Sequence, residues 1–167
     1  AIKLAACLNS LYSSGTADFA SSTPWYQTYV DYAQRNGILT RTFDNCNAPA
    51  TRSEFADVLA GALPRGALQP INSIANGAIP DVSASAENAD AIYLLYRAGV
   101  LTGSNGGRFK PNDPIRRSEV AAIITRMAVP SLRQSVTIDT DTPAGNVLSA
   151  DEILAKCGPA VFKLTSY

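Results

Sequence analysis

Two arginines precede Ser-Glu in the chain, and an arginine is a natural partner for an anion. Arg52-Ser53-Glu54 follows Gly37-Ile38-Leu39-Thr40, and Arg117-Ser118-Glu119 follows Gly99-Val100-Leu101-Thr102. An apolar run with helical spacing follows each tripeptide, so both arginines are expected in the first turn of a helix. A cation there faces the positive end of the helix dipole, which is unfavourable by roughly a few tenths of a kcal/mol. The repeated placement therefore predicts a negatively charged partner for each arginine.

The predicted partner is either internal or external to the chain. An Asp or Glu of the same chain would make each arginine one half of a structural ion pair. An external carboxylate or phosphate would make it a binding residue, because free helix N–H groups and a guanidinium together form an anion site. We therefore treat Arg52 and Arg117 as candidate anion-binding residues.

The first of the two helix starts matches a capping box, in which Thr51 accepts from the N–H of Glu54 and Glu54 accepts from the N–H of Thr51. The second has Arg116 in place of the threonine, so its cap is expected to be weaker unless Asp113 substitutes for it. The cap residues expected to support the arginines are Thr51, Glu54 and Glu119.

Two further segments could contact a ligand. Trp25, the only tryptophan, opens an expected helix and either belongs to the core or offers a stacking face to a sugar ring. Glu87 takes the corresponding position before the second tripeptide, since it precedes Gly99 by the same distance as Trp25 precedes Gly37. The segment Gly103-Ser104-Asn105-Gly106-Gly107 either forms a turn or cradles an oxyanion with its amides.

Composition limits the classes of function. The 167 residues are 46% hydrophobic and 17% charged, with 14 basic and 14 acidic side chains, so no net charge attracts nucleic acid. No apolar run approaches the roughly 18 residues that span a bilayer, which argues against membrane insertion. Histidine is absent, so we expect no Ser-His-Asp triad, no catalytic residues, no metal site and no cofactor. The three cysteines leave a Cys7–Cys46 disulfide open.

The apolar periodicity predicts five helices, and hence a mainly α fold. In the first helix two apolar sets have this spacing, Leu4/Cys7/Leu8/Leu11 and Ala1/Leu4/Ala5/Leu8. Pro24 is expected at the first position of the second helix. Residues 133–147 are typical of a linker, and the tail 148–167 predicts a short helix followed by a β-like run. The five helices are expected over residues 1–12, 25–36, 52–63, 87–98 and 117–129.

The chain resembles the S-layer homology domain in the order of its motifs. An aromatic residue and a helix precede Gly-Val-Leu-Thr-Gly, Phe-x-Pro and Ile-x-Arg-Ser-Glu, seen here as Trp25, Gly99–Gly103, Phe109-Lys110-Pro111 and Ile115–Glu119. The resemblance covers residues 1–132. It implies the end of repeat one at 1–13, repeat two at 24–64 and repeat three at 80–130.

This resemblance implies a pseudo-threefold bundle of helix-loop-helix units that binds secondary cell-wall polysaccharide, commonly through pyruvylated sugars. Such a module would anchor an exported protein to a Gram-positive-type surface. The glycan-binding positions that the resemblance implies are Arg52, Arg117, Trp25, Gly103 and Asn105. Arg41 in place of Gly103, Glu87 in place of tryptophan and Arg116 in place of threonine predict two related sites of unequal strength. The incomplete first repeat makes self-association an open expectation.

The tail has a second resemblance, over Leu148–Ile153 and Cys157–Phe162, to the opening of a trypsin-like serine protease domain. It implies that the parent protein is a surface protease, while this chain is not an enzyme. Two alternatives to glycan anchoring therefore stay open: a non-catalytic protease fragment, and a helical protein-interaction module with internally paired arginines.

Overall fold

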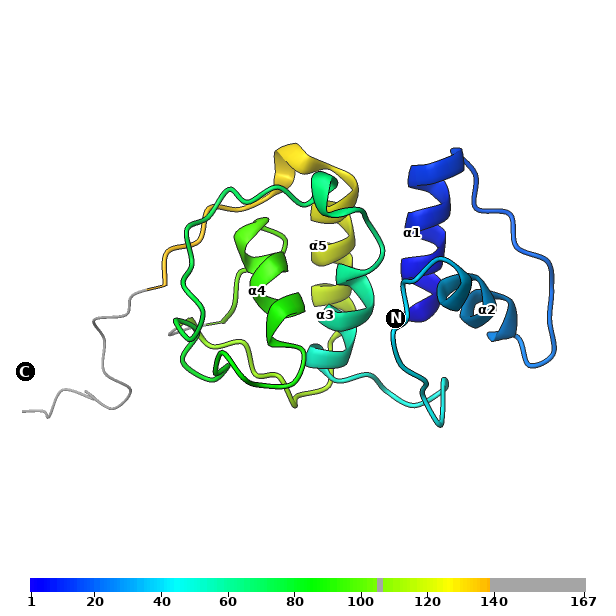
Figure 1. Ribbon diagram of the computed structural model, residues 1–167, viewed down its shortest axis with the longest axis horizontal. Helices are drawn as coiled ribbons and strands as arrows, with labels where there is room; N and C mark the ends of the chain where they lie inside the picture. Colours follow the sequence, from blue (N-terminus) through cyan, green and yellow to red (C-terminus); the bar gives the residue numbers. More distant parts are fainter. Residues whose placement is uncertain (105–106, 139–167) are drawn as a thin grey trace, which may run out of the picture.

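The computed structural model describes residues 1–104 and 107–138, and these form a helical fold (Figure 1). Two short 3₁₀ turns, Arg65–Ala67 and Pro130–Leu132, follow the third and fifth α-helices. The described ranges contain an isolated bridge between Thr51 and Pro114 and no sheet. The prediction of a mainly α fold is confirmed. The α-helices are α1 (Ile2–Ser14), α2 (Gln27–Arg35), α3 (Arg52–Ala60), α4 (Ala89–Arg97) and α5 (Arg117–Ala128).

The first four helices pack as two pairs, α1 with α2 and α3 with α4, and the contact between α1 and α3 joins the pairs. Helix α1 contacts both α2 and α3, and α3 in turn contacts α4. The start of α5 meets the start of α3 through the Arg52–Glu119 ion pair, and Figure 1 shows α4 and α2 at opposite sides of the fold. No helix of the described residues is both long and apolar enough to cross a membrane.

The core is built from the predicted apolar stripes of α3, α4 and α5. Each large side chain removed from water there contributes roughly 1.5–3 kcal/mol to folding. The spacing of these residues places one face of each helix inward, as the periodicity predicts. The buried members of the stripes are Phe55, Val58, Leu59, Ala62, Ile92, Leu95, Ala98, Ile123 and Met127.

The apolar stripes predicted for α1 are only partly buried. Ala5 and Ala6 are fully buried and Leu8 packs against the core, whereas Leu4 and Leu11 are 37% and 51% exposed. Small side chains let helix backbones approach closely, so α1 meets its neighbours mainly through its alanines. Leu4 and Leu11 then fall on the solvent side.

Helices α2 and α4 begin later than their sequence patterns predict. Pro24 is not the first helical residue, because Trp25 and Tyr26 form a turn and α2 starts at Gln27. Helix α4 starts after Asn88, whose φ of 60° lies in the left-handed region that asparagine tolerates better than most residues. Glu87 therefore precedes the helix that it was expected to open.

The first part of the predicted linker packs onto the fold. Gln134 N donates to Gly99 O (2.9 Å), Val136 N donates to Asn72 Oδ1 (2.9 Å), and Asn72 Nδ2 donates to Gln134 O (3.0 Å). A Cβ on Gly99 would lie 2.7 Å from Gln134 O, so only glycine allows this approach. The rest of the predicted linker and the tail 148–167 lie outside the described residues.

Cys7 and Cys46 are free thiols in this structure. Burial raises the pKa of the Cys7 thiol, and Lys3 partly offsets the shift. Cys46 Sγ lies 4.0 Å from the carbonyl oxygen of Phe43. The disulfide that the sequence left open is not formed.

Candidate functional site

Arg52 is buried and its guanidinium is bound inside the protein. The residue is 9% exposed. Its Nε donates to Phe109 O (2.6 Å), its Nη1 donates to the carboxylate of Glu119, and its Cζ lies 5.0 Å from the centre of the Phe109 ring. The negatively charged partner predicted for Arg52 is therefore present in the chain itself.

The start of α3 has no free amide left for an external anion. The capping box is confirmed: Glu54 N donates to Thr51 Oγ1 (3.1 Å) and Thr51 N donates to Glu54 Oε2 (2.8 Å). The two remaining first-turn amides, on Arg52 and Ser53, donate to the carbonyl oxygens of Asp113 and Pro111, both at 2.9 Å. The loop before α5 thus closes the start of α3.

The start of α5 is open. Arg116 and Arg117 are both exposed, and no described residue bonds to the Arg117 guanidinium. Arg116 N donates to Glu119 Oε2 (2.9 Å), but an arginine side chain carries only donors and cannot accept from the helix. Asp113 does not replace the threonine, because no first-turn amide of α5 donates to its carboxylate. The start of α5 therefore carries exposed positive charge, and only the bond from the Arg116 amide to Glu119 is formed of its capping box.

Glu119 links the two helix starts. One carboxylate oxygen, Oε1, pairs with Arg52, while Oε2 accepts from the first residue before α5. A residue predicted only as a cap is thus also the ion-pair partner of the other repeat. No sequence pattern predicts this pairing, because the contact joins positions in different repeats.

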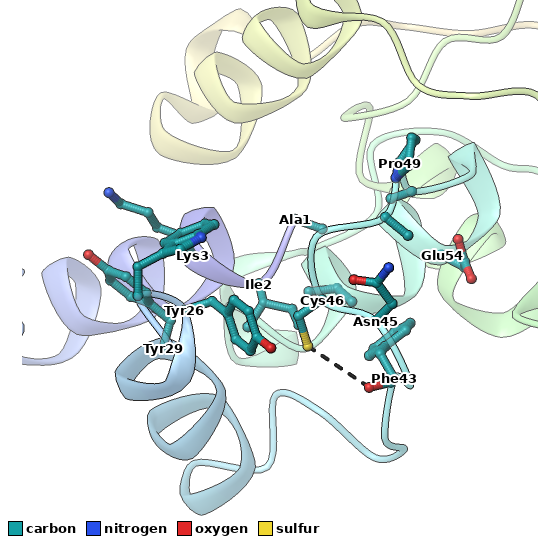
Figure 2. A pocket seen from close by; sticks show the side chains of 14 residues that line it. Ala1, Ile2, Lys3, Tyr26, Tyr29, Phe43, Asn45, Cys46, Pro49 and Glu54 are labelled. Atoms are coloured by element: carbon teal, nitrogen blue, oxygen red, sulfur yellow. Dashed lines mark hydrogen bonds between the residues drawn. The ribbon is translucent and has the colours of Figure 1, made fainter. Parts of the chain in front are cut away.

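Trp25 lies at a pocket between the start of α1, the start of α2 and the loop that leads to α3. We call this the Trp25 pocket (Figure 2). Its volume is about 130 Å³. Trp25 is 57% exposed and its Nε1 donates to Asn47 Oδ1 (3.2 Å), so it is not a core residue. The lining residues are Ala1, Ile2, Lys3, Trp25, Tyr26, Tyr29, Phe43, Asn45, Cys46, Ala48, Pro49, Ala50, Glu54 and Val58.

Lys3 lines this pocket and was missed by the sequence analysis. Its Nζ lies 5.1 Å from the centre of the Tyr29 ring, and no carboxylate of the described residues pairs with it. The rings of Trp25 and Tyr29 are 6.4 Å apart. The pocket therefore brings together an exposed indole, further aromatic rings and a cation. No sequence motif connects Lys3 with Trp25.

Two positions at which the repeats differ meet in the structure. Arg41 Nη1 donates to Glu87 Oε1 (2.6 Å), and Arg41 Nε lies 3.5 Å from Asp57 Oδ2. Burial raises the pKa of the Asp57 carboxyl, and Arg41 partly offsets the shift. An ion cluster thus links the two repeats through residues that replace a glycine and a tryptophan.

Gly103 lies against a buried tyrosine. Its φ is 73°, and a Cβ there would lie 2.8 Å from the Tyr96 hydroxyl. That hydroxyl has no hydrogen-bond partner among the described residues, and burial raises the pKa of Tyr96. The Tyr96 ring lies 6.0 Å from Phe109, on which Arg52 stacks. Gly103 and Arg52 therefore flank one aromatic pair, while Asn105 lies outside the described residues.

The predicted glycan-binding residues do not form one site. Arg52 and Gly103 lie beside Phe109 and Tyr96, Arg117 lies at the open start of α5, and Trp25 lies at its own pocket. Only Trp25 shares a described pocket with a cap residue, Glu54.

Comparison with known proteins identifies one segment. Residues 78–121, from the end of the long loop before α4 into α5, match the family model of the S-layer homology domain. No curated protein and no solved structure matches the chain. The matched segment contains Arg117, Gly103 and Glu119. Residues 78–121 thus correspond to an S-layer homology domain, and domains of this family are non-catalytic modules that hold extracellular proteins at the cell surface through cell-wall polysaccharide.

Proposed function

We propose that this chain anchors an exported protein to a Gram-positive-type bacterial surface by binding an anionic, pyruvylated secondary cell-wall polysaccharide. Residues 1–132 act as one module in this proposal. Residues 1–13 close repeat one, 24–64 form repeat two and 80–130 form repeat three.

The observation that carries the proposal is the exposed Arg117 at the open start of α5. Its guanidinium has no carboxylate partner among the described residues, whereas that of Arg52 does. A guanidinium binds a carboxylate by donating two parallel N–H bonds, and the positive electrostatic potential of an adjacent helix start also favours the anion. Arg116 places a second positive charge beside it. A pyruvyl carboxylate on a sugar is a suitable partner for this arrangement.

The other predicted residues have supporting roles in this proposal. Trp25 stacks on a sugar face, and Gly103 and Asn105 offer backbone and polar contacts. Arg52 contributes through Nη2, since its Nε and Nη1 are bonded within the protein. Its main effect on binding then comes from holding the loop before α5 in place.

Sedimentation with purified sacculi tests the proposal. The chain should pellet with walls that retain acidic polysaccharide and remain in solution with walls stripped of it. Arg117→Ala should weaken binding about tenfold, the loss of one charge-assisted contact. Arg65→Ala removes another exposed arginine and should leave binding unchanged. Arg52→Ala combined with Arg117→Ala should abolish binding. Equal pelleting with both kinds of wall would exclude the proposal.

One observation favours a second candidate, a helical protein-interaction module. The Arg52–Glu119 pair shows that one repeated arginine serves the fold. If Arg117 also serves protein contacts, Arg117→Ala should leave wall binding intact. It should instead alter self-association, measured by sedimentation equilibrium. A protease role of the parent protein depends on the tail, and this chain should show no peptidase turnover.

A further inference from the structure

We infer that the Trp25 pocket is an acidic-sugar subsite in which one sugar residue stacks on the indole while Lys3 binds its carboxylate. This inference rests on the proposed function and adds to it a cation that no motif identifies. It also assigns recognition of the acid to a lysine of α1, in addition to the arginines of the repeated tripeptides.

The pocket has the size and the surface for one sugar residue. A volume of about 130 Å³ corresponds to roughly four water molecules at about 30 Å³ each, which is room for the buried part of one sugar residue but not for a longer stretch of chain. Aromatic rings offer flat apolar faces against which the C–H face of a sugar can lie. The Trp25 indole is 57% exposed, so one part of it is free for such a contact.

The indole is oriented before any ligand binds. Its N–H donates to Asn47 Oδ1 (3.2 Å), and its ring lies edge-on to Tyr26 at 5.8 Å between centroids. A side chain held in this way loses little freedom on binding. This favours Trp25 as the stacking platform over the exposed aromatic Tyr12, which has no such support.

Lys3 is the cation of the pocket that is free to turn toward a ligand. It is exposed, and its described partner is the face of Tyr29, 5.1 Å from Nζ. A cation–π contact at an exposed site is weak. A carboxylate can therefore displace it, and the ammonium gains a full opposite charge in exchange.

The negative group of the pocket lies away from Lys3. Figure 2 shows Lys3 with Tyr26 and Tyr29 on one side of the pocket and Glu54 on the other. Glu54 Oε2 accepts from both the amide and the hydroxyl of Thr51, at 2.8 and 3.1 Å. Glu54 is thus held at the start of α3 and repels an acid placed near it. The bound sugar should consequently direct its carboxylate toward Lys3.

The fluorescence of Trp25 tests the inference directly, because it is the only tryptophan of the chain. Purified acidic wall polysaccharide is titrated into the protein, and in parallel the same polysaccharide after reduction of its carboxyl groups to alcohols. The variants are Lys3→Gln, Lys3→Arg and, as a matched control, Lys110→Gln at an exposed lysine outside the pocket. Circular dichroism verifies that each variant is folded.

The expected result is a change in Trp25 emission on binding, with a preference for the acidic over the reduced polysaccharide. Lys3→Gln should reduce that preference about tenfold, while Lys3→Arg and Lys110→Gln retain it. An unchanged preference in Lys3→Gln would overturn the role of Lys3 and leave wall anchoring intact. Sacculus binding without any change in Trp25 emission would overturn the pocket as the subsite. No binding to acidic sacculi would overturn the proposed function together with this inference.

Discussion

The starts of α3 and α5 share the tripeptide Arg-Ser-Glu but use its arginine in opposite ways. At α3 the arginine is buried, stacked on Phe109 and paired with Glu119, and every first-turn amide has an acceptor. At α5 the arginine is exposed and has no bonded partner among the described residues. The difference arises from the segment that packs against each helix start. The loop 111–113 covers the start of α3, and no described segment covers the start of α5 in this way. The arginine of the same motif thus forms a buried ion pair in one repeat and stays exposed to solvent in the next.

The two helix starts should differ most in how much their arginines contribute to the stability of the fold. Arg52→Ala removes a buried ion pair and a bond to Phe109 O, so the free energy of unfolding should fall by about 2–4 kcal/mol. Arg117→Ala should change it by no more than about 0.5 kcal/mol, as usual for an exposed side chain. Urea denaturation followed by circular dichroism measures both. Equal losses in the two variants would show that the arginines are equivalent after all.

Removal of the complete cap should have the next largest effect. Thr51→Ala deletes the acceptor of the Glu54 amide and should destabilise the fold by about 1 kcal/mol. Arg116→Ala at the corresponding position should be nearly neutral, because the arginine side chain accepts no bond from α5. The same urea titration compares them. A loss of similar size in Arg116→Ala would mean that the arginine stabilises α5 by another route.

A gain of stability should follow when the second cap is completed. Arg116→Thr supplies the missing acceptor opposite Glu119 and should raise the free energy of unfolding by about 0.5 kcal/mol or slightly more. It should weaken wall binding at the same time, since it removes positive charge beside Arg117. Thermal denaturation and sacculus sedimentation measure the two effects. A variant that is stabilised and binds walls as before would exclude Arg116 from recognition.

The smallest effect is expected at the ion cluster between the repeats. Glu87→Gln removes the negative charge from the 2.6 Å contact with Arg41, but the Glu87 side chain is largely exposed, so the loss should be about 0.2–1 kcal/mol. The difference from the wild type should shrink in high salt. A loss that does not respond to salt would indicate packing rather than charge as its cause.

Local patterns predicted the helices and the capping box because both depend on residues close in sequence. The stripes of α3 and α4 and the Thr51–Glu54 pair are examples. The buried face of α1 was only partly predicted because its leucines and alanines satisfy the same periodicity, and only the neighbouring helices decide which face is buried. The late start of α2 escaped prediction because the turn at Trp25 and Tyr26 continues into the helix without a break in composition.

The candidate site was harder to predict because its contacts join distant residues. Glu119 bonds to Arg52 across 67 positions, and the match of Arg41 with Glu87 follows from the packing of one repeat on the next. Lys3 reaches the Trp25 pocket only because α1 lies beside α2. The substitutions at Arg116, Arg41 and Glu87 predicted two binding sites of unequal strength, which stays a prediction, and no sequence pattern indicated the burial of Arg52.

The segment that follows α5 has a mechanical consequence. Gln134 is hydrogen-bonded to Gly99, within the segment 80–130, and Val136 is hydrogen-bonded to Asn72, in the loop between residues 64 and 80. Tension applied downstream of Ile138 therefore reaches these bonds before it reaches the last turn of α5. The load is shared with the segments that carry Gly99 and Asn72, and α5 does not unwind from its end under the first pull.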